Sequence, residues 1–356
     1  MSAVTVLTVT YGDRWPTLRG TLASVLDEPA AHIVVVANGP RPASAAELRS
    51  FAAEHSGRVQ VVALEENLGS APAFAAGLAV AYGYGDAVLI LDDDNPIPPG
   101  LISDLRSVEE ATRAKLPAGH PFALEVFRGV NSVHRAIAEG ASVDYLFREQ
   151  RPGAFQGFDL PALLNARLRG RAVTHASNAH RMLTVRAGGG THTLVEIPNA
   201  MWGGLFLPED VVSRGPLPKT ELVLYGDDND FSTRLGKQGI AIYLCLDLAI
   251  EDTLVWKVPQ RLPGLRRRLP TTFQLPDSDS WRMQYLHRNQ AYLSRVRMEG
   301  TKPASRLRFA LNVAAKLVLL AGFGVLAGRP GYAAKLIAAS TSGLRGKLGP
   351  SYPLPG

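Results

Sequence analysis

The sequence predicts an α/β fold in which a mostly parallel, Rossmann-like sheet is followed by a basic helical C-terminal extension. Over the first hundred residues, short apolar runs rich in β-branched residues alternate with segments of helical spacing. Such alternation is typical of parallel sheets with right-handed crossovers. The strand segments are apolar along their whole length, which is typical of strands buried on both faces. The third observation is a change of charge after residue 256, where the chain becomes strongly basic.

The expected strands and helices follow one another in strict alternation. The strands cover residues 3–10, 33–37, 59–64 and 87–91. The helices between them cover residues 18–26, 43–54 and 71–82. Turn-forming residues close the strands: Tyr-Gly after the first, Asn-Gly-Pro after the second and Asn-Leu-Gly after the third. The fourth strand runs directly into three aspartates.

Several classes of protein are excluded by what the sequence lacks. The turn from Thr10 to Arg14 lacks G-x-G-x-x-G, and no Walker A sequence is present, so a nucleotide would be held in another way. Cys245 is the single cysteine, which excludes an intrachain disulfide and a zinc site built on several thiolates. The first residues lack the basic region of a signal peptide, so a reducing cytoplasm is the expected compartment.

Charge is distributed unevenly along the chain. Residues 257–356 contain 17 lysines and arginines but 3 acidic residues, a net charge of +14, whereas residues 1–256 carry −8. A basic tail on an acidic body suggests an anionic partner, either nucleic acid or a membrane surface. The alternative is a solvated basic face. Because the tail charges are interleaved with leucine, valine and alanine, the sequence favours a membrane over nucleic acid.

Asp92, Asp93 and Asp94 follow the fourth expected strand. Adjacent carboxylates repel one another, so a cation is expected nearby. Alternation along the chain directs Asp92 and Asp94 to the same side, and oxygen ligands suit Mg²⁺ or Mn²⁺. The carboxyl end of a parallel strand is also where ligands bind in open α/β sheets. The competing interpretation is a solvated turn, since Asp-Asn-Pro favours turns.

A second acidic cluster, Asp227-Asp228-Asn229-Asp230, precedes a helix expected to begin near Phe231. Acidic residues in a first helical turn are often dipole partners or caps, and Asp230 is expected to have that role. Asp227 and Asp228 are expected to precede the helix and to face a cleft. Upstream, a tryptophan lies beside two glycines, which permits close backbone approach and a flat apolar platform for a sugar; a core aromatic is the alternative.

Six motifs in order resemble those of the GT2 family of glycosyltransferases, which have the GT-A fold. They are Val9-Thr10-Tyr11 with Arg14, Ala37-Asn38-Gly39, Glu66–Ala71, Leu91–Asp94, Trp202–Leu207 and Gly226–Arg234. The galactofuranosyl- and rhamnosyltransferase branch is the most similar. The resemblance covers roughly residues 3–252 and extends to about 300.

The resemblance implies a role for each motif. It assigns nucleotide-sugar binding to Thr10, Tyr11, Arg14, Asn38, Asn67, Asp92 and Asp93. It assigns the metal to Asp92 and Asp94, and sugar or acceptor contacts to Trp202, Gly203 and Gly204. Asp228 is the expected catalytic base, and Asp227 would position the acceptor or share the role of base. Arg288 lies in a W-x-x-x-Y-x-x-R-N stretch that would recognise the acceptor or a lipid phosphate, or would be part of a basic helix packed on the catalytic domain.

Two departures from the family pattern are present. Ala37 stands where the family often has aspartate, so contacts to the base or ribose would differ. Many relatives have a metal-binding histidine after the last sheet strand, but in this sequence that stretch contains none. Asp252 or Glu251 could replace it, because Mg²⁺ accepts carboxylates readily.

The expected activity is that of an inverting, metal-dependent glycosyltransferase. It would move galactofuranose or rhamnose from a UDP- or dTDP-linked donor to a hydroxyl of a lipid-linked or cell-envelope glycan. Mn²⁺ or Mg²⁺ would be the cofactor, and the enzyme would lie at the inner face of the cell membrane, with self-association left open. The alternatives are a polyprenyl-phosphate sugar synthase and a non-catalytic nucleotide-sugar-binding protein.

The remaining segments give weaker signals. Residues 117–195 contain most of the histidines, interpreted as surface residues because their spacing matches no zinc pattern. Residues 150–160 and 186–193 are expected to be loops that could close over the donor, and Gly188-Gly189-Gly190 to be a hairpin or mobile loop. Residues 306–326 are apolar but include Lys316, which favours an interfacial helix over a spanning one. The expected domains are 1–256 catalytic, 257–300 acceptor-side and 301–356 membrane-associating.

Overall fold

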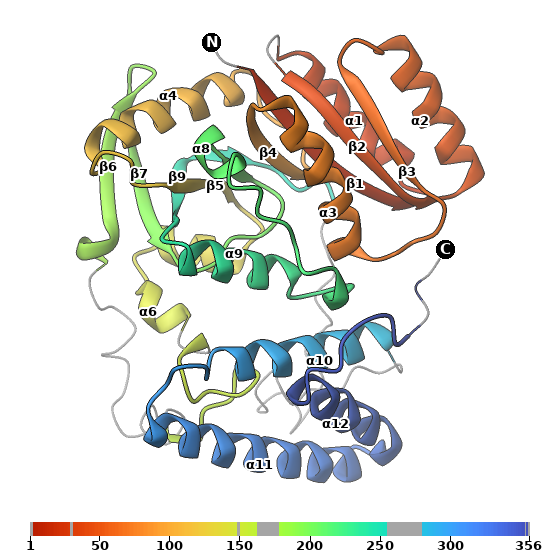
Figure 1. The fold of residues 1–356 in the computed structure, drawn as a ribbon, viewed down its shortest axis with the longest axis vertical. Helices are drawn as coiled ribbons and strands as arrows, with labels where there is room; N and C mark the ends of the chain where they lie inside the picture. Colours follow the sequence, from red (N-terminus) through yellow and green to blue (C-terminus); the bar gives the residue numbers. More distant parts are fainter. Residues whose placement is uncertain are drawn as a thin grey trace.

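A nine-stranded mixed sheet forms the centre of this computed structural model (Figure 1). The structure describes residues 3–28, 31–147, 150–161, 178–254, 280–352 and 354. The strands are β1 (Val4–Gly12), β2 (Ala31–Pro40), β3 (Val59–Leu64), β4 (Ala87–Asp92), β5 (Phe122–Arg128), β6 (Met182–Ala187), β7 (Gly190–Ile197), β8 (Leu205–Leu207) and β9 (Ala241–Ile250). Their order across the sheet is β3-β2-β1-β4-β8-β5-β9-β7-β6.

The first four strands are parallel, and short β8 interrupts that pattern. β1 pairs with β2 and β4, and β2 pairs with β3, all in parallel. β8 lies antiparallel between β4 and β5. β5 then pairs with β9 in parallel, and the β6–β7 hairpin adds two antiparallel strands at the far edge. The carboxyl ends of β1, β2 and β4 therefore meet at one edge, where polar residues follow each strand.

Helices cover both faces of the sheet, as the fully apolar strands predict. On one face are α1 (Trp15–Leu26), α2 (Pro42–Glu54) and α4 (Leu101–Lys115), and on the other α3 (Ser70–Ala81) and α9 (Asp227–Lys237). Val35 and Val36 show the division: both are fully buried, but Val35 packs with Leu22 of α1 and Val36 with Leu78 of α3. The predicted α/β fold is confirmed.

Some boundaries differ from those expected. β4 includes Asp92, and α9 begins at Asp227 rather than near Phe231, so Asp227 and Asp228 lie in the first helical turn. The expectation that these two precede the helix is wrong. The left-handed backbone of Gly226, with φ of 81°, lets the helix start at that point. Gly188-Gly189-Gly190 lies at the turn of the β6–β7 hairpin.

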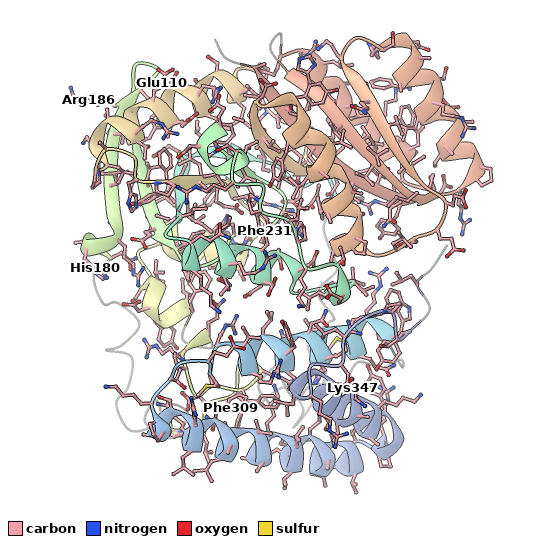
Figure 2. The ribbon with its side chains drawn as sticks, in the orientation of Figure 1. Glu110, His180, Arg186, Phe231, Phe309 and Lys347 are labelled. Carbon is pink, nitrogen blue, oxygen red and sulfur yellow. The ribbon has the colours of Figure 1, made fainter. Side chains whose placement is uncertain are left out.

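A layer of three C-terminal helices packs beneath the sheet (Figure 1). The helices are α10 (Trp281–Val296), α11 (Pro303–Leu326) and α12 (Pro330–Leu344). In Figure 2, Phe309 and Lys347 lie in this layer, apart from Phe231 near the sheet. α10 and α12 approach so closely at Gly343 that a Cβ there would lie 1.9 Å from the carbonyl oxygen of Arg288. The predicted boundary at residue 300 therefore separates helices that pack together, while that at 256 lies outside the described residues.

The segment expected to be a donor lid, residues 150–160, is packed against the C-terminal helices instead. The Lys316 ammonium donates to the Gln156 carbonyl at 2.7 Å, and the Asn312 amide donates to the Gly153 carbonyl at 2.7 Å. The Gln156 amide in turn donates to the Ser340 hydroxyl at 2.8 Å. Buried polar groups need such partners, so this segment and the helical layer form one packed unit.

Candidate functional site

A cavity of about 290 Å³ opens at the carboxyl ends of β1, β2 and β4. It is lined by most of the residues that the motifs single out, namely Tyr11, Arg14, Asn38, Asn67, Asp92, Asp93, Asp94, Trp202, Asp227 and Asp228. Residues that were not predicted as site residues also line it, including Ser70, Tyr225, Trp281, Arg282 and Leu354. The edge of the sheet, the first turns of α3 and α9, and the start of α10 therefore share one cavity.

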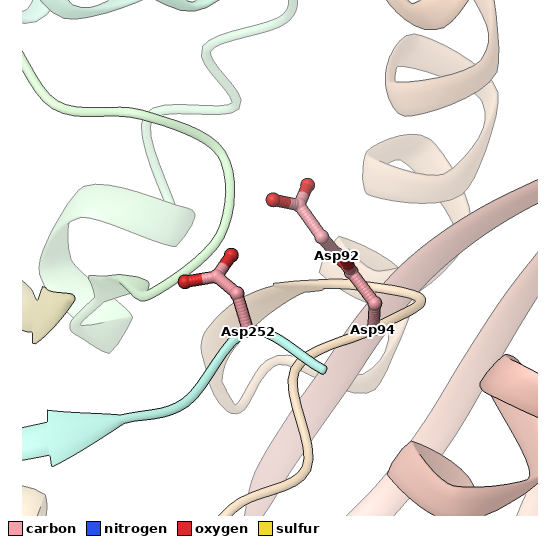
Figure 3. A group of neighbouring side chains, drawn as sticks. All are labelled: Asp92, Asp94 and Asp252. Carbon is pink, nitrogen blue, oxygen red and sulfur yellow. The ribbon is translucent and has the colours of Figure 1, made fainter. Parts of the chain in front are cut away.

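Three carboxylates form a candidate metal centre at the end of β4 (Figure 3). Ligand oxygens of Asp92, Asp94 and Asp252 all lie within 4.8 Å of one another. Burial, together with the negative charges of Asp92 and Asp93, raises the pKa of Asp94 to about 6. No group in the described part of the chain donates a hydrogen bond to the Asp94 carboxylate, so both of its oxygens are free to bind a cation.

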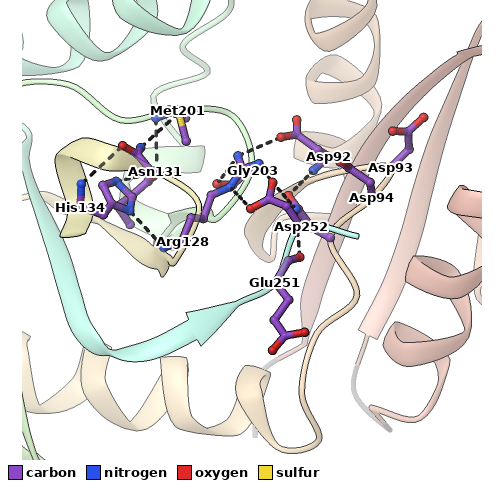
Figure 4. Close-up of polar contacts among 12 residues, drawn as sticks. Asp92, Asp93, Asp94, Arg128, Asn131, His134, Met201, Gly203, Glu251 and Asp252 are labelled. Atoms are coloured by element: carbon purple, nitrogen blue, oxygen red, sulfur yellow. Dashed lines mark hydrogen bonds and ion pairs between the residues drawn. The ribbon is translucent and has the colours of Figure 1, made fainter. Parts of the chain in front are cut away.

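Arg128, which no motif singled out, lies beside this centre at the end of β5 (Figure 4). Its guanidinium donates to Asp92 Oδ2 at 2.9 Å and binds both carboxylate oxygens of Asp252. Asn95 also donates to Asp252, at 3.2 Å. Asp252 is thus near enough to be the third ligand, but its oxygens already accept hydrogen bonds. A hard divalent cation fits the donor set, with Asp92 and Asp94 as its freest ligands.

Gly203 is required by this arrangement. A Cβ at that position would lie 2.5 Å from Arg128 Nη1 and 2.6 Å from Asp92 Oδ2. The neighbouring Gly204 has φ of 99°, which side chains other than glycine rarely tolerate. The two glycines therefore form the wall behind the carboxylates, and neither lines the cavity itself.

Asp93 is bound by the first loop instead of facing a cation. Arg14 holds it through two hydrogen bonds, of which that from Nε to Oδ2 measures 2.6 Å. The Thr10 hydroxyl adds a third, at 2.8 Å. Thr10 is buried behind the cavity, whereas Arg14 and Asp93 line it. The first predicted motif thus joins the three-aspartate motif through a partly buried ion pair.

The Ala37-Asn38-Gly39 motif is hydrogen-bonded to the turn at Asn67 and Leu68 in the third motif. The Asn38 amide donates to Asn67 Oδ1 at 3.0 Å, and Asn38 Oδ1 accepts from the Leu68 amide at 2.9 Å. A Cβ on Gly39 would lie 2.3 Å from the Asn67 nitrogen, which explains the glycine. Asn38 is 2% exposed, so the described contacts make it primarily a support for the turn at Asn67, which reaches the cavity.

Asp227 and Asp228 differ in their surroundings. Asp227 is 3% exposed, and one of its oxygens accepts from the Ser70 hydroxyl at 2.8 Å and from the Trp202 indole at 2.9 Å. Asp228 accepts only from the Asn229 amide, at 2.7 Å, among the described residues. Burial and the neighbouring Asp227 raise the pKa of Asp228 to about 7. The expectation that the helix N-terminus keeps Asp228 fully ionised at neutral pH is therefore wrong, because desolvation outweighs it.

Trp202 supports Asp227 and is not an open sugar platform. Its ring stacks on Phe74 with centroids 4.6 Å apart and contacts Phe231 at 4.9 Å. The residue is 6% exposed. Trp202 is therefore mainly a core aromatic, which was the alternative interpretation. Part of its side chain still lines the cavity.

Arg288 does not reach the cavity. Its side chain is fully buried, and its guanidinium donates to the carbonyls of Leu222 and Gly349. The Asn289 amide donates to the carbonyls of Leu222, Leu224 and Tyr225, at 2.8 to 2.9 Å. The expectation that Arg288 contacts the acceptor directly is therefore not met by its position. The pair fixes the segment that leads into Asp227 and Asp228.

That segment is strained, which explains why it needs support. Val223 and Tyr225 both have φ of 66°, in the left-handed region that β-branched and bulky residues avoid. Such residues cost on the order of 1–3 kcal/mol each and persist only where their surroundings hold them. α10 supplies that support from one side and α3 from the other, through the Ala71 amide bound to the Val223 carbonyl at 3.1 Å.

One of the histidines expected at the surface is buried, whereas His180 is exposed as expected. His134, interpreted as a surface residue, is 3% exposed and accepts from the Arg128 amide through Nδ1 at 3.1 Å. Burial lowers its pKa to about 4, so it is neutral at physiological pH. No histidine joins the carboxylate centre within the described ranges. His175 lies outside those ranges.

Part of the chain matches a glycosyltransferase family model. Residues 5–156 match the model described as Glycosyl transferase family 2. No curated protein matches the chain. Among solved structures, similar folds include a Pyrobaculum calidifontis mannosyltransferase with GDP-Man and Mn²⁺ (15% identity, TM-score 0.49, covering 97% of this chain and 87% of that one). GalNAc-T7 with UDP, GalNAc and Mn²⁺ is also similar (14% identity, TM-score 0.49, covering 97% of this chain and 58% of that one). So is S. aureus TarS (12% identity, TM-score 0.44, covering 96% of this chain and 55% of that one).

The family match covers the strands that carry the first acidic cluster. Residues 5–156 include β1 to β5 and therefore Arg14, Asp92, Asp94 and Arg128. The expectations of a glycosyltransferase enzyme and of an α/β fold with a helical C-terminal region are confirmed. The chain spans a little over half the length of GalNAc-T7 and of TarS.

Proposed function

We propose, from the glycosyl transferase family 2 domain that residues 5–156 carry, that the protein is an inverting, metal-dependent hexosyltransferase. Its donor would be a UDP- or dTDP-linked sugar, with galactofuranose or rhamnose favoured by the resemblance of the motifs. Its acceptor would be a hydroxyl of a lipid-linked or cell-envelope glycan. The single observation that supports this most is the shared cavity, which brings the carboxylates after β4 and the acidic start of α9 to one volume.

The two acidic groups suit two different tasks in sugar transfer. Asp92 and Asp94 would hold Mn²⁺ or Mg²⁺, which when bound neutralises negative charge on a leaving diphosphate. Arg128 fixes Asp92 and Asp252 in place, so that the ligand oxygens converge before a cation binds. Asp252 is the proposed third ligand and would exchange a hydrogen bond from Arg128 for the cation.

Asp228 is the proposed base. A carboxylate whose pKa is about 7 is matched to accept a proton at neutral pH. In an inverting transfer the acceptor oxygen forms a bond to the anomeric carbon while the bond to the donor diphosphate breaks. The acceptor hydroxyl proton passes to Asp228 Oδ as that bond forms. Asp227, fixed by Ser70 and Trp202, would orient the acceptor.

Turnover and stereochemistry test this proposal. The full chain is incubated with UDP-galactofuranose, dTDP-rhamnose and other nucleotide-sugars, each with Mn²⁺, with Mg²⁺ or with EDTA. We expect transfer to a glycan hydroxyl with inverted anomeric configuration by NMR, and loss of activity in EDTA. Full activity in EDTA, or a retained configuration, would contradict the proposal. Transfer to polyprenyl phosphate instead of a hydroxyl would favour a polyprenyl-phosphate sugar synthase.

The proposed location at the inner membrane face rests on α11. By length and composition alone α11 could span a membrane, with mean hydropathy of 2.0. Its buried face, however, carries Asn312 and Lys316, whose polar groups bind residues 153–156. Its outward face after Arg308 carries no charged residue and exposes Leu311, Val318, Val325 and Leu326 by 60 to 82%. Exposed basic residues lie at its N-terminal end, Lys302 and Arg306, and along α12 and the residues after it, Lys335, Arg345 and Lys347.

An apolar strip flanked by basic residues is typical of a helix that lies in a membrane interface. Vesicle co-sedimentation tests this with phosphatidylcholine and phosphatidylglycerol at a 3:1 ratio. Val318→Glu should weaken vesicle binding by roughly tenfold, because it brings a charge to the apolar face. Met182→Glu, at an exposed apolar position on β6, is the matched control. Equal binding by wild type and Val318→Glu would exclude α11 as the contact. Deleting residues 301–356 would be a poor test, since Arg288 depends on Gly349.

A further inference from the structure

The first turn of α10 forms one wall of the donor cavity. Trp281 and Arg282 line it together with Tyr11 of β1 and Tyr225 of the segment before α9. Trp281 opens the W-x-x-x-Y-x-x-R-N stretch, for which the resemblance implies acceptor or lipid-phosphate recognition around Arg288, and the resemblance assigns no donor contact to Arg282. The helical layer therefore contributes side chains to the same volume as Asp92, Asp94 and Asp228.

Arg282 differs from the other arginines near the cavity. Arg14 is paired with Asp93, and Arg128 with Asp92 and Asp252. Arg282 lines the cavity beside the phenol groups of Tyr225 and Tyr11, and it forms no ion pair with a carboxylate anywhere in the described sequence. Its positive charge in the cavity is held in place by neutral groups. A guanidinium positioned in this way is available for an anionic ligand.

The surroundings of Arg282 add to this availability. α10 has no acidic residue in its first turn, and no side chain in the described part of the chain caps its N-terminus. Free amides and the helix dipole at such an end favour anions. The Arg282 guanidinium carbon lies 5.2 Å from the Trp281 ring centroid, which limits its freedom. A planar, pre-positioned guanidinium pairs well with phosphate oxygens.

We propose that Arg282 and the first turn of α10 bind the diphosphate of the donor nucleotide, so that the C-terminal helical layer completes the donor site. This rests on the proposed function, since a nucleotide-sugar supplies the diphosphate. Arg282 would donate its N–H groups to diphosphate oxygens and exchange its contacts with Tyr11 and Tyr225. Arg14, by contrast, already has the Asp93 carboxylate as its partner.

Binding of nucleoside diphosphates to the full chain tests the inference. UDP, dTDP and GDP are titrated with Mn²⁺ by calorimetry into wild type, Arg282→Gln and Arg282→Lys. Arg295→Gln is the matched control, because Arg295 is an exposed arginine on the same helix. For the diphosphate that wild type binds most tightly, Arg282→Gln should raise Kd about ten- to a hundredfold, as expected when a charge-assisted hydrogen bond is lost. The Kd of Arg282→Lys should lie between those of wild type and Arg282→Gln, and the Kd of Arg295→Gln should be within about twofold of wild type.

The corresponding nucleoside monophosphate distinguishes the diphosphate from the base and ribose. Arg282→Gln should weaken monophosphate binding several-fold less than diphosphate binding. Equal loss for both ligands would overturn the assignment to the diphosphate. Equal diphosphate affinity in Arg282→Gln and Arg295→Gln would overturn the inference while leaving the proposed function intact. If wild type binds none of the three diphosphates, the proposed function fails, and this inference with it.

A measurement on the wild-type chain covers the case in which Arg282→Gln does not fold. Phenylglyoxal modifies accessible arginines, and mass spectrometry locates the products. Saturating diphosphate with Mn²⁺ should reduce modification of Arg282 at least several-fold and leave Arg295 unchanged. Equal modification of Arg282 with and without the diphosphate would contradict the inference.

Discussion

The two acidic clusters of the cavity look alike in sequence but differ in their tertiary partners. Around Asp92 to Asp94, arginines from β5 and the loop after β1 pair with carboxylates. Around Asp227 and Asp228, the hydrogen-bond donors are neutral: a hydroxyl, an indole and a backbone amide. In the first cluster the arginines thus hold Asp92, Asp93 and Asp252 in convergent positions, while burial and its acidic neighbours raise the pKa of Asp94 to about 6. The second leaves a buried carboxylate with little compensation, and its pKa rises toward neutrality.

This difference explains how one cavity could hold a cation and accept a proton. A carboxylate next to a cation remains ionised and cannot act as a base near neutral pH. A carboxylate that lacks a cationic partner changes its charge in that range. The comparison yields four predictions, beginning with the largest expected effect.

Asp94→Ala should abolish activity. Of the three carboxylates in the candidate metal centre, that of Asp94 accepts no hydrogen bond from the described residues. Its loss therefore removes the freest metal ligand. We expect turnover to fall by at least about 10³-fold, since a bound metal contributes several kcal/mol to the transition state. Mn²⁺ titration by calorimetry should show lost binding. Asp104→Ala, which removes an exposed carboxylate from α4, is the control. Unchanged Mn²⁺ affinity in Asp94→Ala would show that the metal binds at another site.

Asp228→Asn should lower turnover by about 10²–10⁴-fold, the usual contribution of a general base. The amide keeps the size of the side chain but cannot accept the proton, so donor affinity should be retained. Asp230→Asn is the matched control, because Asp230 is bound by Arg234 at 2.8 Å within α9. If Asp227→Asn loses turnover and Asp228→Asn does not, the base is Asp227. If both retain it, the acidic start of α9 is structural.

Asp93→Asn and Asp228→Asn should change stability in opposite directions. Asp93 is paired with Arg14, and breaking a buried pair by removing one partner costs about 3–5 kcal/mol. Asp228 has a raised pKa, so its ionised form destabilises the fold at neutral pH. Replacement by asparagine should therefore leave stability equal or higher. Urea unfolding at pH 7.5 measures both. A loss of stability in Asp228→Asn equal to that in Asp93→Asn would show that the two clusters do not differ as proposed.

The pH profile gives the smallest effect. Asp228 must be ionised to accept a proton, and its pKa in the folded protein is about 7. With Mn²⁺ saturating at every pH, kcat/KM should therefore rise with pH up to about 7 and level off above it. Below pH 7 it should fall about tenfold per unit. A rate that stays flat between pH 5.5 and 8 would mean that no group with this pKa limits the reaction.

Much of the fold could be predicted from the sequence because its signals are local. Apolar runs and turn residues predicted the first four strands, and β3 matches the expected residues 59–64. The three aspartates were placed correctly at the end of β4, because a strand end is fixed by the pattern beside it. The start of α9 was misplaced by four residues, since glycine before an acidic run fits either a loop or a helix start.

The sequence by itself determined the first four strands of the sheet, the two acidic clusters and the basic, apolar tail. Tertiary structure alone decided which side chains meet around them. Arg128 comes from β5 and has no motif, yet it binds Asp92 and Asp252. Arg288, expected to contact the acceptor, instead supports the strained segment before Asp227, and Arg282 reaches the cavity in its place. These contacts join residues far apart in the chain. Their charges and pKa values depend on burial and neighbours, which local patterns do not encode.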